Sequence, residues 1–174
     1  AILPVHILGH PCDMDPILSV ARKYDLPVVE DATESLGSIY KGQMAGNMGD
    51  VACFSFNGNK LITTGGGGMV VTGNEEWARR AHYLTTQAKD DSLEYIHNEI
   101  GYNYRLTNIQ AALGMAQMEL LDEFLAAKRA IACNYENAFR NLEEITPMFA
   151  QPGTEPTYWL YTALLPAGTT LDQR

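Results

Sequence analysis

Three polar residues follow apolar stretches of the sequence and could hold a ligand between strands. Asp31 ends a short apolar run, Ser55 lies near the end of another, and Lys60 follows five residues later in a turn of Gly and Asn residues. In parallel α/β sheets, ligands collect outside the carboxyl ends of the strands. We therefore expect the carboxylate of Asp31 and the amine of Lys60 to face a common crevice.

A carboxylate, a hydroxyl and a lysine in this order along the chain meet the needs of pyridoxal 5'-phosphate. The amine forms a Schiff base with the aldehyde of the cofactor and acts as a general base once it is released. The carboxylate keeps the pyridine nitrogen protonated through a charge-assisted hydrogen bond worth about 1.5–3 kcal/mol. A hydroxyl just before the lysine is placed to bind the phosphate. Lys60, Asp31 and Ser55 fit these roles in turn.

Each of the three residues also has an interpretation without a ligand. An Asp at a strand end often caps the following turn, and a lysine in a polar turn is commonly solvated. Ser55 alternates with Phe54 and Phe56, which fits the polar face of a strand. The combination in one sequence is more informative than any of its members.

Four consecutive glycines, residues 65–68, come shortly after Lys60. They do not form a Walker loop, because a strand follows them and no Gly-Lys-Ser/Thr is present. They also do not open a helix, as a dinucleotide-binding fingerprint would. We expect them to permit positive φ angles and a close approach of the backbone beside Lys60, the alternative being a flexible turn without a ligand.

A metal site is disfavoured by the spacing of the candidate ligands. His6, His10 and Cys12 lie in or just after the first predicted strand, and no fourth ligand is spaced to complete a set. We therefore predict no metal.

Hydrophobic periodicity predicts an α/β fold with a mostly parallel sheet, flanking helices and one long helix. Two apolar strands joined by a helix are typical of parallel pairing. The expected elements are strands over 2–8, 26–31, 51–56, 69–72 and 157–165, helices from Asp13 or Asp15 to about 24, over 75–85 and over 107–142, and a loop over 86–104. Pro147 and the Pro-Gly pair at 152–153 predict a boundary that separates a unit of residues 1–146 from a linker and a further unit of residues 147–174.

The overall composition excludes several classes of function. The net charge of −9 and the pI near 4.8 disfavour binding to nucleic acid, where phosphate neutralisation dominates. No stretch approaches the roughly 18–20 consecutive apolar residues of a membrane span. Cys12, Cys53 and Cys133 are odd in number and show no paired spacing, which predicts reduced thiols and a cytoplasmic protein.

Four segments then carry a resemblance to a known family. They are VEDATESLG at 29–37, SFNGNK at 55–60, TGGGGMVVT at 64–72, and GYNYRL followed by NIQAA within 101–112. In this order they resemble the DegT/DnrJ/StrS family of nucleotide-sugar aminotransferases, and the similarity extends loosely over nearly the whole chain. The resemblance implies the large domain of a fold-type-I pyridoxal-phosphate enzyme that acts as a homodimer.

The resemblance also implies a role for each matching residue. Lys60 is the Schiff-base lysine, Asp31 the partner of the pyridine nitrogen, and Ser55 a phosphate ligand. Glu34 stands where the family often has Gln or His near the phenolic oxygen of the cofactor. Asn103 matches the residue that reaches the phosphate of the cofactor in the neighbouring subunit.

The implied reaction transfers an amino group from an amino acid, typically glutamate, to a keto sugar attached to a nucleotide. A related branch of dehydratases replaces the lysine by histidine, so Lys60 favours transamination. Family members are roughly twice as long and carry a phosphate-binding turn and a stacking aromatic ring upstream, and a small domain downstream of residue 158. The rival hypothesis is therefore a non-catalytic α/β fragment that folds and self-associates without cofactor.

Overall fold

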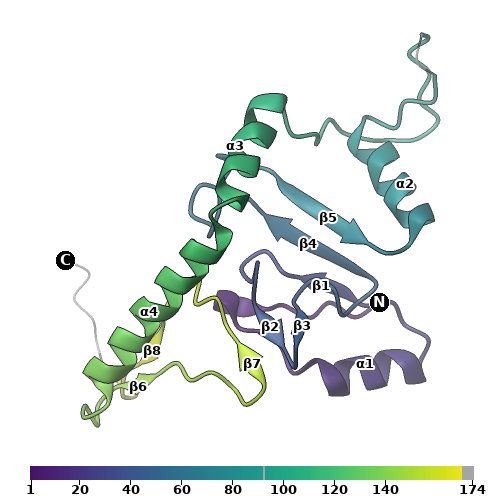
Figure 1. The fold of residues 1–174 in the computed structure, drawn as a ribbon. Coiled ribbons are helices and arrows are strands. Elements are labelled where there is room, and N and C mark those ends of the chain that lie inside the picture. Colours follow the sequence, from purple (N-terminus) through teal and green to yellow (C-terminus); the bar gives the residue numbers. More distant parts are fainter. Residues whose placement is uncertain (92, 170–174) are drawn as a thin grey trace.

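The computed structural model describes residues 1–91 and 93–169 and centres on a three-stranded sheet (Figure 1). The strand order is β1 (Val29–Asp31), β4 (Val51–Ser55) and β5 (Gly68–Thr72). β1 and β4 run parallel, and β4 and β5 run antiparallel. The parallel pair places the ends of β1 and β4 at the same edge of the sheet, with Asp31 opposite Cys53 and thus two residues from Ser55.

The first predicted strand forms only in part. Residues 2–5 run parallel to β1 through isolated bridges, in which Ile2 pairs with Val28 and Val5 with Asp31. Leu3 and Ile7 are exposed, so the segment is not the buried strand predicted over 2–8. The chain instead turns over Ile7–Gly9, where Leu8 and Gly9 take positive φ angles of 58° and 84° that an extended strand does not allow.

The main apolar core lies between the helix α1 (Met14–Lys23) and the segments around β1 and β2 (Ile39–Tyr40). Asp13 occupies the N-cap of α1 as predicted, but its side chain accepts a hydrogen bond from the hydroxyl of Tyr40 at 2.6 Å rather than from the helix backbone. The fully enclosed core is formed by Met14, Ala21, Val28 and Tyr40, with Ile2, Cys12, Ile17, Leu18 and Met48 packed against it.

Two smaller sheets join distant parts of the sequence. The strands β3 (Gln43–Met44), β2 (Ile39–Tyr40) and β7 (Thr154–Glu155) form one antiparallel sheet in that order. The strands β6 (Thr146–Pro147) and β8 (Ala163–Leu164) form the other. Because β7 pairs with β2, the chain after residue 146 returns to the first forty residues.

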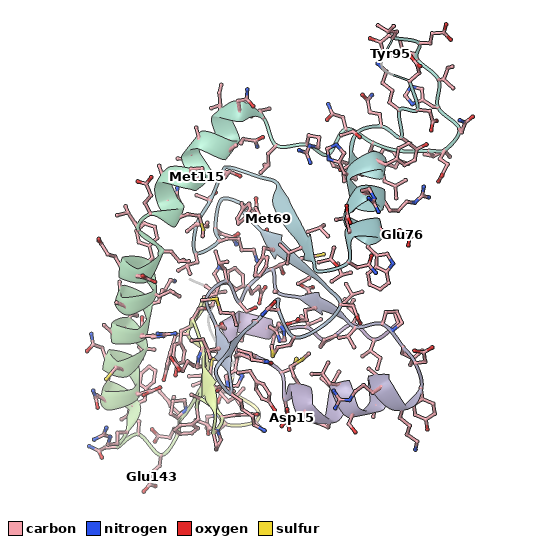
Figure 2. The ribbon with its side chains drawn as sticks, turned by 45° about the vertical axis from the view of Figure 1, so that its right-hand side comes forward. Asp15, Met69, Glu76, Tyr95, Met115 and Glu143 are labelled. Carbon is pink, nitrogen blue, oxygen red and sulfur yellow. The ribbon has the colours of Figure 1, made fainter. Side chains whose placement is uncertain are left out.

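The helix α2 (Glu75–Thr85) has the predicted bounds. Its start is fixed by Asn74, whose side-chain oxygen accepts hydrogen bonds from the backbone N–H groups of Glu76 at 3.0 Å and Trp77 at 3.1 Å. The described residues between α2 and the next helix are irregular, as predicted, and they project away from the sheet with Tyr95 near their tip (Figure 2).

The prediction of a single long helix over 107–142 is wrong in one respect. The helical segment divides into α3 (Asn108–Met118) and α4 (Leu121–Phe139) (Figure 1). Thr107 caps α3 in a capping box with Gln110. At Leu120 the backbone takes φ −105° and ψ 8°, outside the helical range, which interrupts the hydrogen-bond ladder. No Pro or Gly marks this break, and the apolar spacing continues across it.

The strand predicted over 157–165 is also wrong, apart from the two residues of β8. Tyr158 has a φ of 50°, and the N–H of Thr157 donates to the carbonyl of Gly9 at 3.0 Å. These backbone groups bind a loop rather than a neighbouring strand, so Thr157, Tyr158 and Trp159 are buried against the first half of the chain. Of the predicted unit 147–174, residues 170–174 lie outside the described residues.

Within the part of the chain that the structure describes, no helix has the length and apolar character needed to cross a membrane.

Candidate cofactor site

Lys60 lies in the turn that follows β4, and its side chain points into the protein. Its backbone N–H donates to the carbonyl of Asn57 at 3.1 Å, which closes the turn predicted from the Gly and Asn residues. Only 12% of the side chain is exposed, so the interpretation of Lys60 as a solvated surface lysine is wrong. Its Nζ lies 3.7 Å from Oε1 of Glu34 and 3.9 Å from the ring centroid of Trp159.

Glu34 is held in place by both of its carboxylate oxygens. While Oε1 faces Lys60, Oε2 accepts a hydrogen bond from the backbone N–H of Leu8 at 2.6 Å. Leu8 lies in a turn of the chain with positive φ, just after the segment that runs beside β1. The carboxylate is 22% exposed, so the partner of the lysine is largely withdrawn from water.

A small cavity brings together three of the five predicted site residues. Glu34, Ser55 and Lys60 line it, and Thr33 and Trp159 contribute further polar and aromatic walls. The remaining lining residues are Leu36, Leu61 and Ile62. An amine, two hydroxyls and a carboxylate thus line one small cavity together with apolar side chains, a combination of groups that small-ligand sites share.

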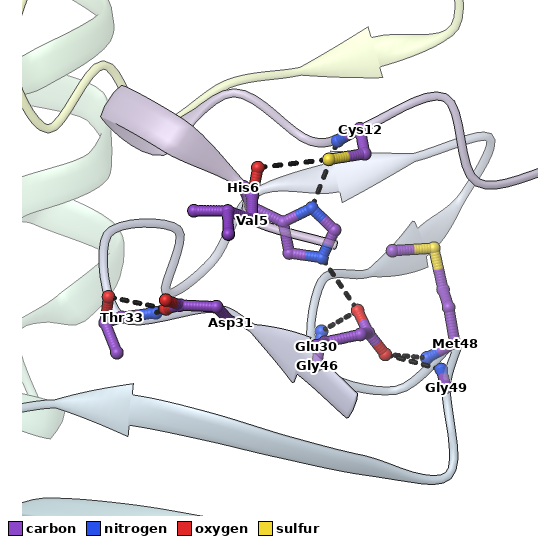
Figure 3. Close-up of polar contacts among 9 residues, drawn as sticks. All are labelled: Val5, His6, Cys12, Glu30, Asp31, Thr33, Gly46, Met48 and Gly49. Carbon is purple, nitrogen blue, oxygen red and sulfur yellow. Dashed lines mark hydrogen bonds and ion pairs between the residues drawn. The ribbon is translucent and has the colours of Figure 1, made fainter. Parts of the chain in front are cut away.

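Asp31, which was expected to share a crevice with Lys60, does not line this cavity and is linked to it only through Thr33, which does. Its Oδ1 accepts hydrogen bonds from the backbone N–H of Thr33 at 3.1 Å and from the Thr33 hydroxyl at 2.7 Å (Figure 3). Asp31 therefore does cap the following turn, and its Oδ2 accepts no hydrogen bond from the described residues. Burial, followed by the charge of Asp31, raises the pKa of the neighbouring Cys53 thiol.

On the opposite face of β1, Glu30 forms a buried polar network. Its Oε2 shares a hydrogen bond with Nε2 of His6 at 2.9 Å, and the carboxylate accepts the backbone N–H groups of Gly46, Met48 and Gly49 at 2.5–2.7 Å (Figure 3). Burial raises the pKa of Glu30, but these hydrogen bonds outweigh it and leave the pKa below its usual value. The network fixes the strand that carries Asp31.

The candidate metal ligands form no complete set: Cys12 lies beside His6, to whose Nδ1 its backbone N–H donates at 3.0 Å, but His10 binds elsewhere. Nε2 of His10 accepts from the backbone N–H of Gln151 at 3.1 Å, and the thiol of Cys12 donates to the carbonyl of Val5 at 3.1 Å. No group of three potential ligands that could bind a metal occurs among residues 1–91 and 93–169.

Asn103 is not brought to Lys60 within the same chain. It forms an antiparallel bridge with Thr86, just after α2, and is exposed. The neighbouring Tyr102 and Tyr104 stack on each other with ring centroids 5.4 Å apart.

Trp159 is the site residue that the sequence pattern did not reveal. It lies almost 100 positions after Lys60, in a stretch whose alternation resembled a strand. Its Nε1–H donates to the carbonyl of Asn59, the residue before the lysine, at 2.7 Å. No local signal predicts such a contact, because it depends on how the end of the chain returns to the sheet.

The groups present fit pyridoxal phosphate. A withdrawn amine, a hydroxyl at the end of β4 and a carboxylate at the end of β1 would supply the nucleophile, the hydrogen-bond donor to the phosphate and the acidic partner of the ring nitrogen. The glycines after Lys60 also behave as predicted, since Gly65 and Gly67 have φ angles of 78° and 84°. Fold and site together define the class as the α/β fold of pyridoxal-phosphate aminotransferases.

Comparison with known proteins identifies the family. The sequence model of the DegT/DnrJ/EryC1/StrS aminotransferase family matches residues 1–174, and the chain belongs to this family. The chain is 47% identical to GDP-perosamine synthase of Caulobacter vibrioides over 177 residues, which cover 99% of this chain and 47% of that protein. It is 44% identical to the putative pyridoxal phosphate-dependent aminotransferase EpsN of Bacillus subtilis, over 97% of this chain and 43% of that protein.

Solved structures agree with this assignment. DesV of S. venezuelae, in complex with a ketimine intermediate, matches with a TM-score of 0.89 and 35% identity over 95% of this chain and 44% of that one. PseC of Helicobacter pylori matches with a TM-score of 0.89 and 28% identity, over 96% of this chain and 46% of that one. The predicted fold class, family and cofactor are thereby confirmed. The chain spans about half the length of the curated relatives that it matches.

Proposed function

We propose that this chain carries the chemical centre of a pyridoxal-phosphate-dependent aminotransferase that moves an amino group from glutamate to a nucleotide-linked keto sugar. The observation that carries the proposal is the withdrawn amine of Lys60 in a cavity shared with Ser55 and Glu34. The names of the relatives support the sugar substrate, since they include GDP-perosamine synthase and a dTDP-3-amino-trideoxyglucose transaminase of Streptomyces venezuelae.

Each residue of the site has a distinct task in this proposal. When bound, pyridoxal phosphate supplies an electron-accepting ring that carries the amino group between the two substrates. Lys60 holds the cofactor through its amine and, once released, moves the proton in both halves of the reaction. Asp31 would hold the pyridine nitrogen through its carboxylate, Ser55 would donate a hydrogen bond from its hydroxyl to the phosphate, and Glu34 would orient the free amine.

The proposal includes a homodimer in which Asn103 serves the partner subunit. Asn103 is exposed and pairs with Thr86 just after α2, so its side chain is accessible to a second copy of the chain. If it completes the partner's site, mixed oligomers of Lys60→Ala and Asn103→Ala chains will bind the cofactor more tightly than Asn103→Ala alone. Equal affinity in the mixture would argue against a shared site.

A cytoplasmic location remains part of the same proposal. Cys12, Cys53 and Cys133 are all free thiols in the structure, which is compatible with a reducing compartment.

The division of the chain into two units at residue 146 stays a prediction.

The deciding experiment traps the cofactor on the lysine. The chain is incubated with pyridoxal phosphate and reduced with borohydride, and its peptides are analysed by mass spectrometry. We expect one phosphopyridoxyl group on the peptide that contains Lys60, and none there in Lys60→Ala. The matched control is Lys41→Ala, which removes an exposed lysine paired with Asp15. Labelling that is spread over exposed lysines, with an oligomer by sedimentation, would instead favour the non-catalytic fragment.

A further inference from the structure

The amine of Lys60 is enclosed from two sides by residues of very different sequence position. On one side stands the carboxylate of Glu34, at 3.7 Å from Nζ. On the other side lies the indole ring of Trp159, with its centroid 3.9 Å from Nζ. A cation over the face of an indole is attracted by the ring quadrupole, and Trp gives the strongest contact of this kind.

The indole is fixed independently of its contact with the amine. Its Nε1–H donates to the carbonyl of Asn59 at 2.7 Å. The backbone carbonyl of Trp159 accepts a hydrogen bond from Nζ of Lys128, on α4, at 2.9 Å. Just before it, Thr157 is fully buried and bound through its N–H to Gly9. The ring therefore has little freedom to leave the lysine while this segment is in place.

We propose that Trp159 is a positioning residue for the amine of Lys60, and that the segment 156–160 after the long helices is thereby part of the cofactor site. This inference rests on the proposed function for its purpose, but its geometry concerns only residues of this chain. The amine is confined between a negative group and an aromatic face, at the place from which it must reach the aldehyde of the cofactor.

The two contacts of Trp159 can be separated by substitution. Trp159→Phe keeps an aromatic face toward Lys60 but loses the N–H that binds the carbonyl of Asn59. Trp159→Ala loses both. If Trp159 only fills space, both variants should change the reactivity of the Lys60 amine in proportion to the side-chain volume that they lose. If Trp159 positions the amine, the Phe variant should keep the reactivity of Lys60 close to that of the unsubstituted chain.

The first test needs no cofactor. The chain is reductively methylated with formaldehyde and cyanoborohydride, and the rate at each lysine is followed by mass spectrometry. We expect Lys60 to react more slowly than Lys23, which is exposed at the end of α1. In Trp159→Ala the rate at Lys60 rises about two- to thirtyfold, the range that the loss of a cation–π contact supports. In Trp159→Phe it stays within about twofold of the unsubstituted chain.

Two further variants guard against misfolding as the explanation. Trp77→Phe, in α2, is the matched control and should leave the rate at Lys60 unchanged. Lys128→Met frees the carbonyl of Trp159 without touching the indole and should give an intermediate rise. Melting temperatures are recorded for all variants. If Trp159→Ala leaves the rate at Lys60 unchanged, or if Trp159→Phe reacts as fast as Trp159→Ala, the inference is overturned.

A second readout separates this inference from the proposed function. The yield of phosphopyridoxyl adduct on Lys60 should fall in Trp159→Ala and recover in Trp159→Phe. If no adduct forms in any chain while the methylation rates behave as expected, the proposed function fails and the role of Trp159 stands. If the adduct forms equally in all variants, Trp159 does not position the amine for the cofactor.

Discussion

The Nζ of Lys60 lies 3.7 Å from Oε1 of Glu34, and the other oxygen of the same carboxylate binds the backbone N–H of Leu8. The acid that faces the lysine is thus tied to a turn 26 residues earlier in the chain. This arrangement orients the pair before any ligand arrives, because Glu34 cannot rotate toward water without leaving the N–H of Leu8 unsatisfied.

Substitutions of Glu34 should separate its charge from its hydrogen bond. Glu34→Gln keeps an oxygen for the N–H of Leu8 and should unfold in urea at nearly the same concentration as the parent chain. Glu34→Ala should lower the free energy of unfolding by about 1–3 kcal/mol, because a withdrawn backbone donor loses its partner. Equal losses in the two variants would show that this hydrogen bond does not anchor the turn.

Asp31→Asn should preserve the fold and weaken the binding of pyridoxal phosphate. The amide oxygen can still accept from Thr33, whereas the negative charge proposed to hold the pyridine nitrogen is lost. We expect the affinity for pyridoxal phosphate, measured by fluorescence titration, to fall about ten- to a hundredfold. The matched control is Asp25→Asn, in the exposed turn after α1, where Asn tolerates the φ of 50°. An unchanged affinity in Asp31→Asn would contradict the assigned role.

The glycine run beside Lys60 offers an internal comparison. A Cβ at Gly68 would collide with the backbone carbonyl oxygen of Phe54, which cannot move without breaking the pairing of β4 with β5. A Cβ at Gly66 would meet no atom within 4 Å. Gly68→Ala should therefore cost about 1–3 kcal/mol of unfolding free energy and Gly66→Ala less than about 0.5 kcal/mol, by urea denaturation. A tolerated Gly68→Ala would mean that β5 does not approach β4 as described.

Stability at acid pH should depend on Glu30. Its pKa in the folded chain is lowered, because hydrogen bonds from His6 and three backbone N–H groups outweigh the effect of burial. The carboxylate therefore stabilises the fold above its ordinary pKa of about 4.3, and this contribution is lost as the pH falls through the lower folded-state pKa.

Glu30→Gln tests this dependence by urea unfolding between pH 7 and pH 3. At pH 7 the variant should be less stable by at least about 3 kcal/mol, since an amide cannot accept all the buried donors. Below about pH 4.5 its stability should change less with pH than that of the parent chain. Parallel curves for the two proteins would exclude Glu30 as the titrating group.

Features that depend on neighbours in sequence could be predicted from the sequence. The bounds of α2, the capping of α3 by Thr107 and the positive φ angles at Gly65 and Gly67 follow from local rules of capping and backbone sterics. The predicted places of Ser55 and Lys60 in one cavity also follow, since both come from the end of a single strand and the turn after it.

Features that depend on contacts between segments distant in sequence were decided only by the tertiary structure. The break at Leu120 leaves the apolar period intact, and the start of the apparent strand at 157–165 becomes a buried loop, because the N–H of Thr157 binds the carbonyl of Gly9 instead of a strand. Trp159 reaches Lys60, and His6 reaches Glu30, across long separations in sequence. Residue type and spacing therefore determined which groups this protein offers to a cofactor. The packing of distant segments decided what surrounds each group, because such contacts have no local period that a sequence can display.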